Sequence, residues 1–76
     1  MPKLPSDLSG IAVVKALAKL GYVIDHQTGS HLILRQQKPP FRRLTVPNHA
    51  VLAKGTLRAI IRQAGLTREE FFKILM

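Results

Sequence analysis

The stretch YVIDHQTGSHLILRQ, residues 22–36, decides the fold that the rest of the chain must complete. Two short runs rich in aliphatic residues flank a glycine-containing turn, which predicts an antiparallel hairpin with strands at Tyr22–His26 and His31–Gln36. Side chains alternate along a strand, so the second strand has one apolar face and one mixed face. We expect Leu32 and Leu34 on the apolar face and His31, Ile33 and Arg35 on the opposite face.

The turn of this hairpin allows two registers. In the first, Thr28 and Gly29 form a two-residue loop, which places His26 opposite His31. Asp25 then lies on the core side of the sheet, among the apolar residues. This register therefore turns a charged side chain toward the interior.

In the second register the loop is Gln27–Gly29, and its glycine supplies the left-handed residue of a bulged turn. Asp25 then lies opposite His31, and Ile24 lies opposite Leu32. Because a one-residue slip turns the whole apolar set toward water, hydrophobic burial favours this second register. It predicts that the Asp25 carboxylate orients the His31 imidazole.

The segments before and after the hairpin predict a helix and a third strand. Residues 1–7 contain two prolines and are expected to form an irregular lead-in. Ser9 is a typical N-cap for a helix that runs to about Leu20 and ends at Gly21. A third strand is expected at Arg42–Val46, because Pro47 ends the extended run. The apolar residues of the first helix at helical spacing are Ile11, Val14, Leu17 and Ala18.

Two further helices are expected after the third strand. The first starts near Thr56, carries an apolar stripe and ends at Gly65. The segment Thr67–Glu70 has the pattern of a capping box and opens a short last helix. The predicted fold class is α+β, with the order α-β-β-β-α plus a short C-terminal helix. We expect an antiparallel three-stranded sheet with its helices on one face.

The composition limits the classes of function. A chain of 76 residues fits a single domain spanning residues 1–76. Twelve Lys and Arg residues against four Asp and Glu residues give a formal net charge of +8. Charge of this density attracts polyanions: nucleic acid first, an acidic protein second and an anionic membrane third.

Several classes of site are not expected. Without cysteine the chain has no disulfide and no thiolate metal site. The three histidines and four acidic residues show no metal-binding spacing, so we expect no metal and no small-molecule cofactor. The apolar run over residues 11–24 is interrupted by Lys15 and Lys19, so it resembles neither a membrane span nor a signal peptide. We therefore expect a cytoplasmic protein without a membrane partner.

Two groups of basic residues predict a phosphate-binding surface. Lys54, Gly55 and Thr56 lie at the start of the second predicted helix, where unpaired N–H groups and the helix dipole favour an anion. Arg58 and Arg62 are four residues apart and extend the positive charge along that helix. The second group lies at the connection between the last two predicted strands and consists of Lys38, Arg42 and Arg43.

Aromatic residues are few. Phe41 is the only one expected to be exposed, because Tyr22, Phe71 and Phe72 fit the core. Sequence-specific reading of single-stranded nucleic acid by stacked bases is therefore not expected.

On the residues alone, His31 permits two interpretations. Most histidines that open a strand are exposed polar residues without a chemical role. An imidazole is partly neutral at pH 7, however, which also suits a general base.

Three motifs in sequence order resemble a known family. GSH at residues 29–31, RRLTVPNH at 42–49 and KGTLRAIIRQAGL at 54–66 are similar to segments of the HicA family of toxins from type II toxin–antitoxin systems. The resemblance covers residues 9–66, and residues 67–76 are an addition. It implies a fold like the double-stranded-RNA-binding domain. It also implies a ribonuclease that cleaves mRNA, with His31 as the catalytic residue, and a partner antitoxin, HicB, that masks this histidine.

The resemblance suggests roles for other residues of the site. His31 is expected to act as general base on a ribose 2′-hydroxyl, and the general acid is His26, His49 or water. Ser30 and Asp25 are expected to support His31. Many members of the family have arginine where this chain has His26, so this position either loses a phosphate contact or gains a second imidazole. Lys54, the amides after Gly55, Arg58 and one of Arg42 or Arg43 are expected to hold the phosphate.

Two other classes of function also fit the residues. A non-catalytic module that binds double-stranded RNA would use the same basic surface to recognise duplex shape. A protein whose charge serves only an acidic partner would bind that partner and would have no affinity for RNA.

Overall fold

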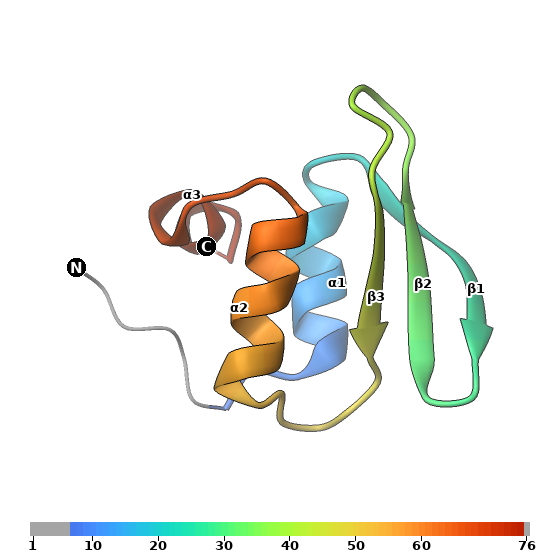
Figure 1. Ribbon diagram of the computed structural model, residues 1–76, viewed down its shortest axis with the longest axis vertical. Coiled ribbons are helices and arrows are strands. Elements are labelled where there is room, and N and C mark those ends of the chain that lie inside the picture. The colour runs from blue at the N-terminus through green and yellow to red at the C-terminus, as the bar shows by residue number, and fades with distance from the viewer. Residues whose placement is uncertain (1–6, 76) are drawn as a thin grey trace.

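The computed structural model describes residues 7–75, which form three helices and a three-stranded antiparallel sheet. The elements in chain order are α1 (Gly10–Ala18), β1 (Tyr22–Thr28), β2 (His31–Gln36), β3 (Arg43–Pro47), α2 (Lys54–Gln63) and α3 (Arg68–Leu75). The strands are ordered β1-β2-β3, and the helices lie on one side of the sheet (Figure 1). This arrangement confirms the predicted α+β class. Of the expected irregular lead-in, only Asp7 lies within the described residues.

The β1–β2 hairpin uses neither of the two expected registers. Thr28 pairs with His31, so the turn is Gly29-Ser30, and Gly29 has a left-handed φ of 58°. Asp25 therefore does not lie opposite His31, and this prediction is wrong. β1 is also two residues longer than expected, and β3 is shifted by one residue toward the C-terminus.

A β-bulge at Asp25 explains the difference in register. The pairing shifts between Ile24 and His26, so β1 contains one residue more than β2 over this stretch. The extra residue lets the turn move while the N-terminal part of β1 keeps its apolar side toward the helices, with Tyr22 only 2% exposed. Ile24 pairs with Leu34 but is 48% exposed, because β1 is the edge strand and extends beyond the helices (Figure 1).

α1 packs against the sheet through a different stripe from the expected one. Gly10, Val13 and Leu17 are buried, whereas Ile11 is 42% exposed. A Cβ atom on Gly10 would collide with the carbonyl oxygen of Pro47, so the helix approaches β3 at a residue that has no side chain. This close approach selects the face of α1 that is buried. The helices and sheet share one hydrophobic core, which also contains Leu32, Leu34, Leu44, Val46, Leu57, Ile60 and Phe71.

The helix ends follow local hydrogen bonding. Ser9 caps α1, and its Oγ accepts a hydrogen bond of 3.0 Å from the backbone of the first turn. α2 begins at Lys54, two residues before the expected start, with Ala53 as the N-cap and without a side-chain cap. The capping box is confirmed, because Thr67 N–H donates to Glu70 Oε1 at 2.8 Å and Glu70 N–H donates to Thr67 Oγ1 at 3.1 Å. No helix within residues 7–75 is both long and apolar enough to cross a membrane.

Candidate active site on the outer face of the sheet

The helices leave one face of the sheet open, and we call it the outer face (Figure 1). His31, Ile33 and Arg35 of β2 point to this face, because the intervening Leu32 and Leu34 are buried in the core. Their partners in the neighbouring strands share the outer face. They are Val23, His26 and Thr28 from β1 and Arg43, Thr45 and Pro47 from β3.

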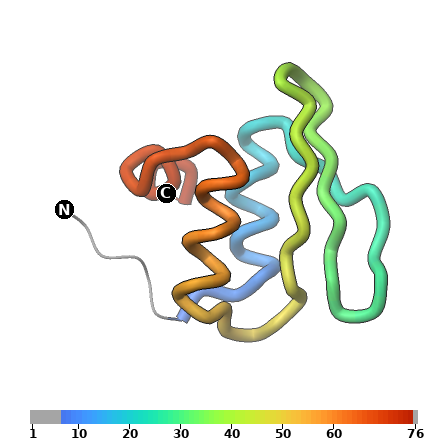
Figure 2. The backbone as a smooth tube through the Cα atoms, in the orientation of Figure 1, coloured from blue at the N-terminus to red at the C-terminus, as the bar shows by residue number. Residues whose placement is uncertain are grey.

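His31 lies at the end of the outer face where a turn and a loop meet. The Asn48 N–H donates a hydrogen bond of 2.6 Å to the Ser30 carbonyl and so joins the β3–α2 loop to the β1–β2 turn. The Gly10 N–H donates to the His49 carbonyl at 3.0 Å, so the start of α1 supports the same loop. Figure 2 shows this turn, this loop and the start of α2 at one end of the chain trace. The fold thus brings the GSH and VPNH motifs together.

Asp25 organises the middle of the outer face. Its Oδ2 accepts a hydrogen bond of 2.8 Å from His26 Nδ1, and its Oδ1 accepts one of 3.3 Å from Arg35 Nε. Arg43 Nη1 is 4.0 Å from Oδ2. The hydrogen bond from His26, followed by that from Arg35, holds the pKa of Asp25 below its usual value. The bulge therefore directs Asp25 toward these three side chains rather than toward His31.

His26 and His31 are diagonal neighbours on the outer face. His26 pairs with Ile33, which is two residues along β2 from His31. Diagonal neighbours in an antiparallel sheet lie about 7–8 Å apart. Both side chains are exposed, and the bond from Nδ1 of His26 to Asp25 leaves its Nε2 free. Two imidazoles are therefore presented to solvent as neighbours on the outer face.

The start of α2 lies at the same end of the molecule as the β1–β2 turn (Figure 1), and His31 is the first residue of β2 after that turn. The first turn of α2 contains no acidic residue, and Ala53 provides no side-chain cap, so its N–H groups stay free for an anion. Lys54 and Gly55 are exposed, and Thr56 is half-buried. The structure therefore brings the first expected basic group to the same end as the GSH turn.

Most of the second expected basic group has a structural role. Arg42 Nη1 donates a hydrogen bond of 3.3 Å to the Gln63 carbonyl, which ties the β2–β3 loop to the end of α2. The aliphatic part of Lys38 packs against the α1–β1 turn. Both residues lie at the end of the sheet remote from the GSH turn. Only Arg43 of this group reaches the outer face.

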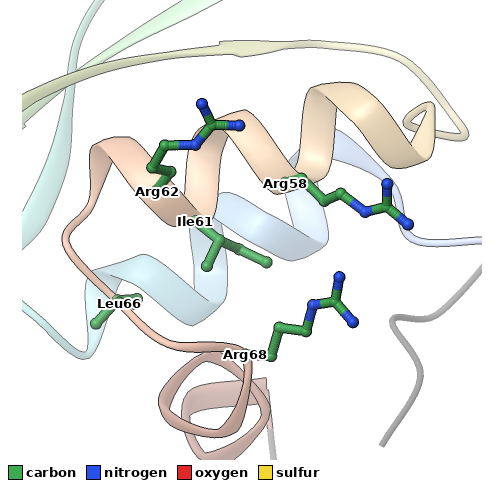
Figure 3. A pocket seen from close by; sticks show the side chains of 5 residues that line it. All are labelled: Arg58, Ile61, Arg62, Leu66 and Arg68. Atoms are coloured by element: carbon green, nitrogen blue, oxygen red, sulfur yellow. The ribbon is translucent and has the colours of Figure 1, made fainter.

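Arg58 and Arg62 lie on a different surface. Together with Ile61, Leu66 and Arg68 they line a hollow of about 280 Å³, which we call the α2–α3 groove. Figure 3 shows the side chains of Arg58 and Arg68 extending from the two helices, with Ile61 between them. α3 lies on the side of the helices away from the sheet (Figure 1), so the structure does not place these arginines with the outer face.

Two arginines in these surfaces, Arg35 and Arg68, were not assigned to a site from the sequence. Strand alternation predicts that Arg35 points to the outer face, but its position opposite Arg43 and its bond to Asp25 depend on the register and the bulge. Arg68 lies in the capping box of α3, and no local pattern relates that helix to α2. Strand alternation could therefore have indicated Arg35 from the sequence, whereas no sequence pattern indicated Arg68.

A comparison with protein families agrees with the three motifs. A family model described as the HicA toxin of bacterial toxin–antitoxin systems matches residues 12–66. The matched segment includes the hairpin, the β3–α2 loop and α2, and it ends before α3. A search of curated proteins finds no significant match. The family match confirms the resemblance seen in the sequence.

Proposed function

Because the chain belongs to the HicA family of toxins from bacterial toxin–antitoxin systems, we propose that it is an endoribonuclease that cleaves mRNA. The observation that carries this proposal is the exposed His31 on the outer face, beside a second imidazole and at the same end of the molecule as the free N–H groups of α2. The toxin–antitoxin family implies a protein partner, and we propose that this partner is a HicB-like antitoxin that covers His31.

In the proposed reaction His31 acts as the general base. Its neutral imidazole removes the proton from a ribose 2′-hydroxyl, and the resulting oxygen attacks the adjacent phosphorus. The bond from phosphorus to the 5′-oxygen breaks, which leaves a 2′,3′-cyclic phosphate and a 5′-hydroxyl. The base, the acid and the cations of this reaction are all side chains or backbone groups of the protein, so the step requires no metal.

We assign the general acid to His26. A general acid has to protonate the leaving 5′-oxygen from the other side of the phosphate, and His26 shares the outer face with His31. Asp25 fixes the orientation of the His26 ring through the 2.8 Å hydrogen bond to Nδ1. The free Nε2 can then carry the proton that the leaving group takes up. His49 is exposed, and within residues 7–75 no hydrogen bond orients its ring, so it ranks second.

We further propose that the start of α2 binds the phosphate. The unpaired N–H groups of the first turn and the ammonium group of Lys54 provide positive charge where the transition state accumulates negative charge. Positioning contributes as well, because a general base alone supplies only about 10²–10⁴-fold. Arg58 and Arg62 are outside this arrangement, since they line the α2–α3 groove.

The variant His31→Gln tests the proposal. We expect it to cleave bulk RNA at least about a hundredfold more slowly than the wild type, because the glutamine amide cannot accept the proton. Detection of 2′,3′-cyclic phosphate ends in the wild-type products checks the chemistry. Lys73→Gln is the matched control, because Lys73 is exposed on α3 and remote from the outer face. Near-normal cleavage by His31→Gln would refute the assignment, and a wild type that binds RNA without cleaving it would indicate a binding module.

A further inference from the structure

The outer face has a hollow at the end opposite to His31. Arg35, Gln36, Gln37, Phe41 and Arg43 line a volume of about 450 Å³, which we call the Phe41 pocket. Phe41 is 63% exposed, an unusual position for a large aromatic side chain in a chain with so few of them. Its contribution to the core is therefore small, and its exposure requires another explanation.

The Phe41 ring is presented by an anchored loop rather than by a loose one. Gln36 is 8% exposed, and its side chain donates to the Leu20 carbonyl at 3.0 Å and accepts from the Arg42 N–H at 3.2 Å. The Phe41 N–H donates to the Lys38 carbonyl at 2.9 Å. Phe41 itself has a φ of 57°, a conformation that aromatic residues rarely adopt. A buried amide thus holds the backbone in a strained shape that turns the ring toward solvent.

Arg35 and Arg43 line the same pocket as Phe41. Arg35 and Arg43 lie directly opposite each other on neighbouring strands, a like-charge pairing that is unfavourable unless an anion lies between the two groups. Asp25 supplies one carboxylate to both of them. Because two positive charges share one negative charge, the pocket retains a net attraction for a further anion.

We propose that the Phe41 pocket is a nucleotide subsite, in which a base stacks on the ring of Phe41 while its phosphate pairs with Arg35 and Arg43. A nucleotide combines the flat apolar surface and the anionic group that this pocket accepts. The subsite proposal rests on the proposed ribonuclease function in one respect: that function supplies the RNA strand to which the bound nucleotide belongs. Arg35 is four positions along β2 from His31, about 13 Å at the usual rise per residue. The bound base therefore belongs to a nucleotide flanking the cleaved bond.

This subsite adds to what the sequence suggested about base recognition. With a single exposed aromatic residue the protein can stack one base at this position, and a continuous stacking platform is not required. Stacking is tolerant of base identity. The subsite therefore fixes the position of an RNA strand along the outer face rather than the sequence at which it is cut.

A tryptophan reporter tests the stacking directly, because the chain contains no tryptophan. We would place Phe41→Trp in the His31→Gln background and titrate it with decauridylate, uridine 5′-monophosphate and inorganic phosphate. We expect quenching by decauridylate, weaker quenching by the mononucleotide and none by phosphate. Lys73→Trp, on α3, is the matched control and is expected to show no quenching. Equal quenching of both reporters, or no quenching of the Phe41→Trp reporter, would overturn the subsite.

A second variant separates the ring from the backbone. Asparagine adopts positive φ more readily than other non-glycine residues, so Phe41→Asn removes the ring while it keeps the shape of the loop. We expect the KM for a short RNA to rise roughly five- to a hundredfold, with kcat within about twofold, since loss of one stacked base costs this much. An unchanged KM, or a lower kcat at constant KM, would contradict the subsite.

The two proposals fail separately. If the wild type does not cleave RNA but the Phe41→Trp reporter is quenched by decauridylate, the ribonuclease proposal is wrong and the subsite stands. If cleavage depends on His31 while the Phe41→Trp reporter is not quenched, the subsite is wrong and the ribonuclease proposal stands.

Discussion

Two surfaces of the molecule carry arginines, and they differ in what surrounds the charges. On the outer face, Arg35 and Arg43 lie opposite each other and share the carboxylate of Asp25. In the α2–α3 groove, three arginines line a hollow whose other lining residues are apolar (Figure 3). Within residues 7–75, the side chains of these three arginines form no hydrogen bond or ion pair. The arginines that contribute to the formal net charge of +8 therefore lie in two different environments.

The difference shows that net charge can indicate the class of partner, here a polyanion, but not the surface on which a reaction takes place. The charged side chains that line the groove are all cationic. The outer face instead combines cations with two imidazoles, a carboxylate and an exposed aromatic ring. Acid–base chemistry requires groups that gain and lose protons, so the outer face is the surface on which we place the reaction.

The largest effect expected from this comparison is that of His26→Gln, which removes the imidazole assigned as general acid. We expect kcat/KM for RNA to fall about a hundredfold, because protonation of the leaving group is lost. The measurement is the rate of cleavage of a short RNA by His26→Gln and by the wild type under the same conditions. Near-normal cleavage by His26→Gln would assign the acid to another group, and His49→Gln would then be the variant to measure.

Two charge-matched double variants compare the surfaces directly. Arg35→Gln/Arg43→Gln and Arg58→Gln/Arg62→Gln each remove two positive charges. We expect the first to lower kcat/KM about tenfold to hundredfold, because charge-assisted hydrogen bonds to phosphate are lost, and the second to lower it less than about threefold. Measurements at about 50 and 200 mM salt would separate site-specific contacts from general attraction. Equal losses would mean that the α2–α3 groove also binds the substrate.

Most of the fold could be predicted from local patterns, because these patterns reflect interactions between neighbours. The Ser9 cap, the capping box at Thr67 and Glu70 and the alternation of β2 depend on residues within one turn or one strand. The register of the hairpin was not predicted, because the pairing shifts at Asp25, whose side chain contacts Arg35 ten residues away. A bulge changes the pairing of two strands, but the alternation of apolar and polar residues in the sequence gives no sign of it.

The part of the candidate site that belongs to one short motif could be predicted from the sequence. The GSH motif identified His31, and strand alternation placed it on the face opposite to the core. Its neighbours were not predictable, because Asp25 belongs to the bulge and Arg42 is drawn to the Gln63 carbonyl of α2. Alternation with the buried Leu44 and Val46 predicts that Arg43 reaches the outer face. The contact between Arg42 and α2, by contrast, depends on residues far apart in the sequence.

A smaller effect is expected from removing the carboxylate that distinguishes the outer face. The pKa of Asp25 is lowered in the folded state, chiefly by the hydrogen bond from His26 and then by that from Arg35. Its ionised form therefore stabilises the fold at pH values above the unfolded pKa, and this contribution is lost as pH falls through the folded pKa. Asp25→Asn should lower Tm at pH 7 by about one or two degrees, since exposed pairs contribute little. Thermal melts from pH 7 to pH 2 should show the two proteins converging at acid pH, and a constant difference would contradict the electrostatic origin.

The smallest effect is expected in the α2–α3 groove, where Arg68→Gln removes one of three neighbouring like charges. We expect the free energy of unfolding to stay the same or to rise by up to about 0.5 kcal/mol, because no ion pair is lost and repulsion is reduced. Any gain should vanish in 1 M salt, where the Debye length is about 3 Å. Lys73→Gln removes the same charge from the same helix outside the groove, so it should leave stability unchanged. Destabilisation by more than about 1 kcal/mol in Arg68→Gln would show instead that the Arg68 side chain is a packing contact for Ile61 and Leu66, as its aliphatic part allows.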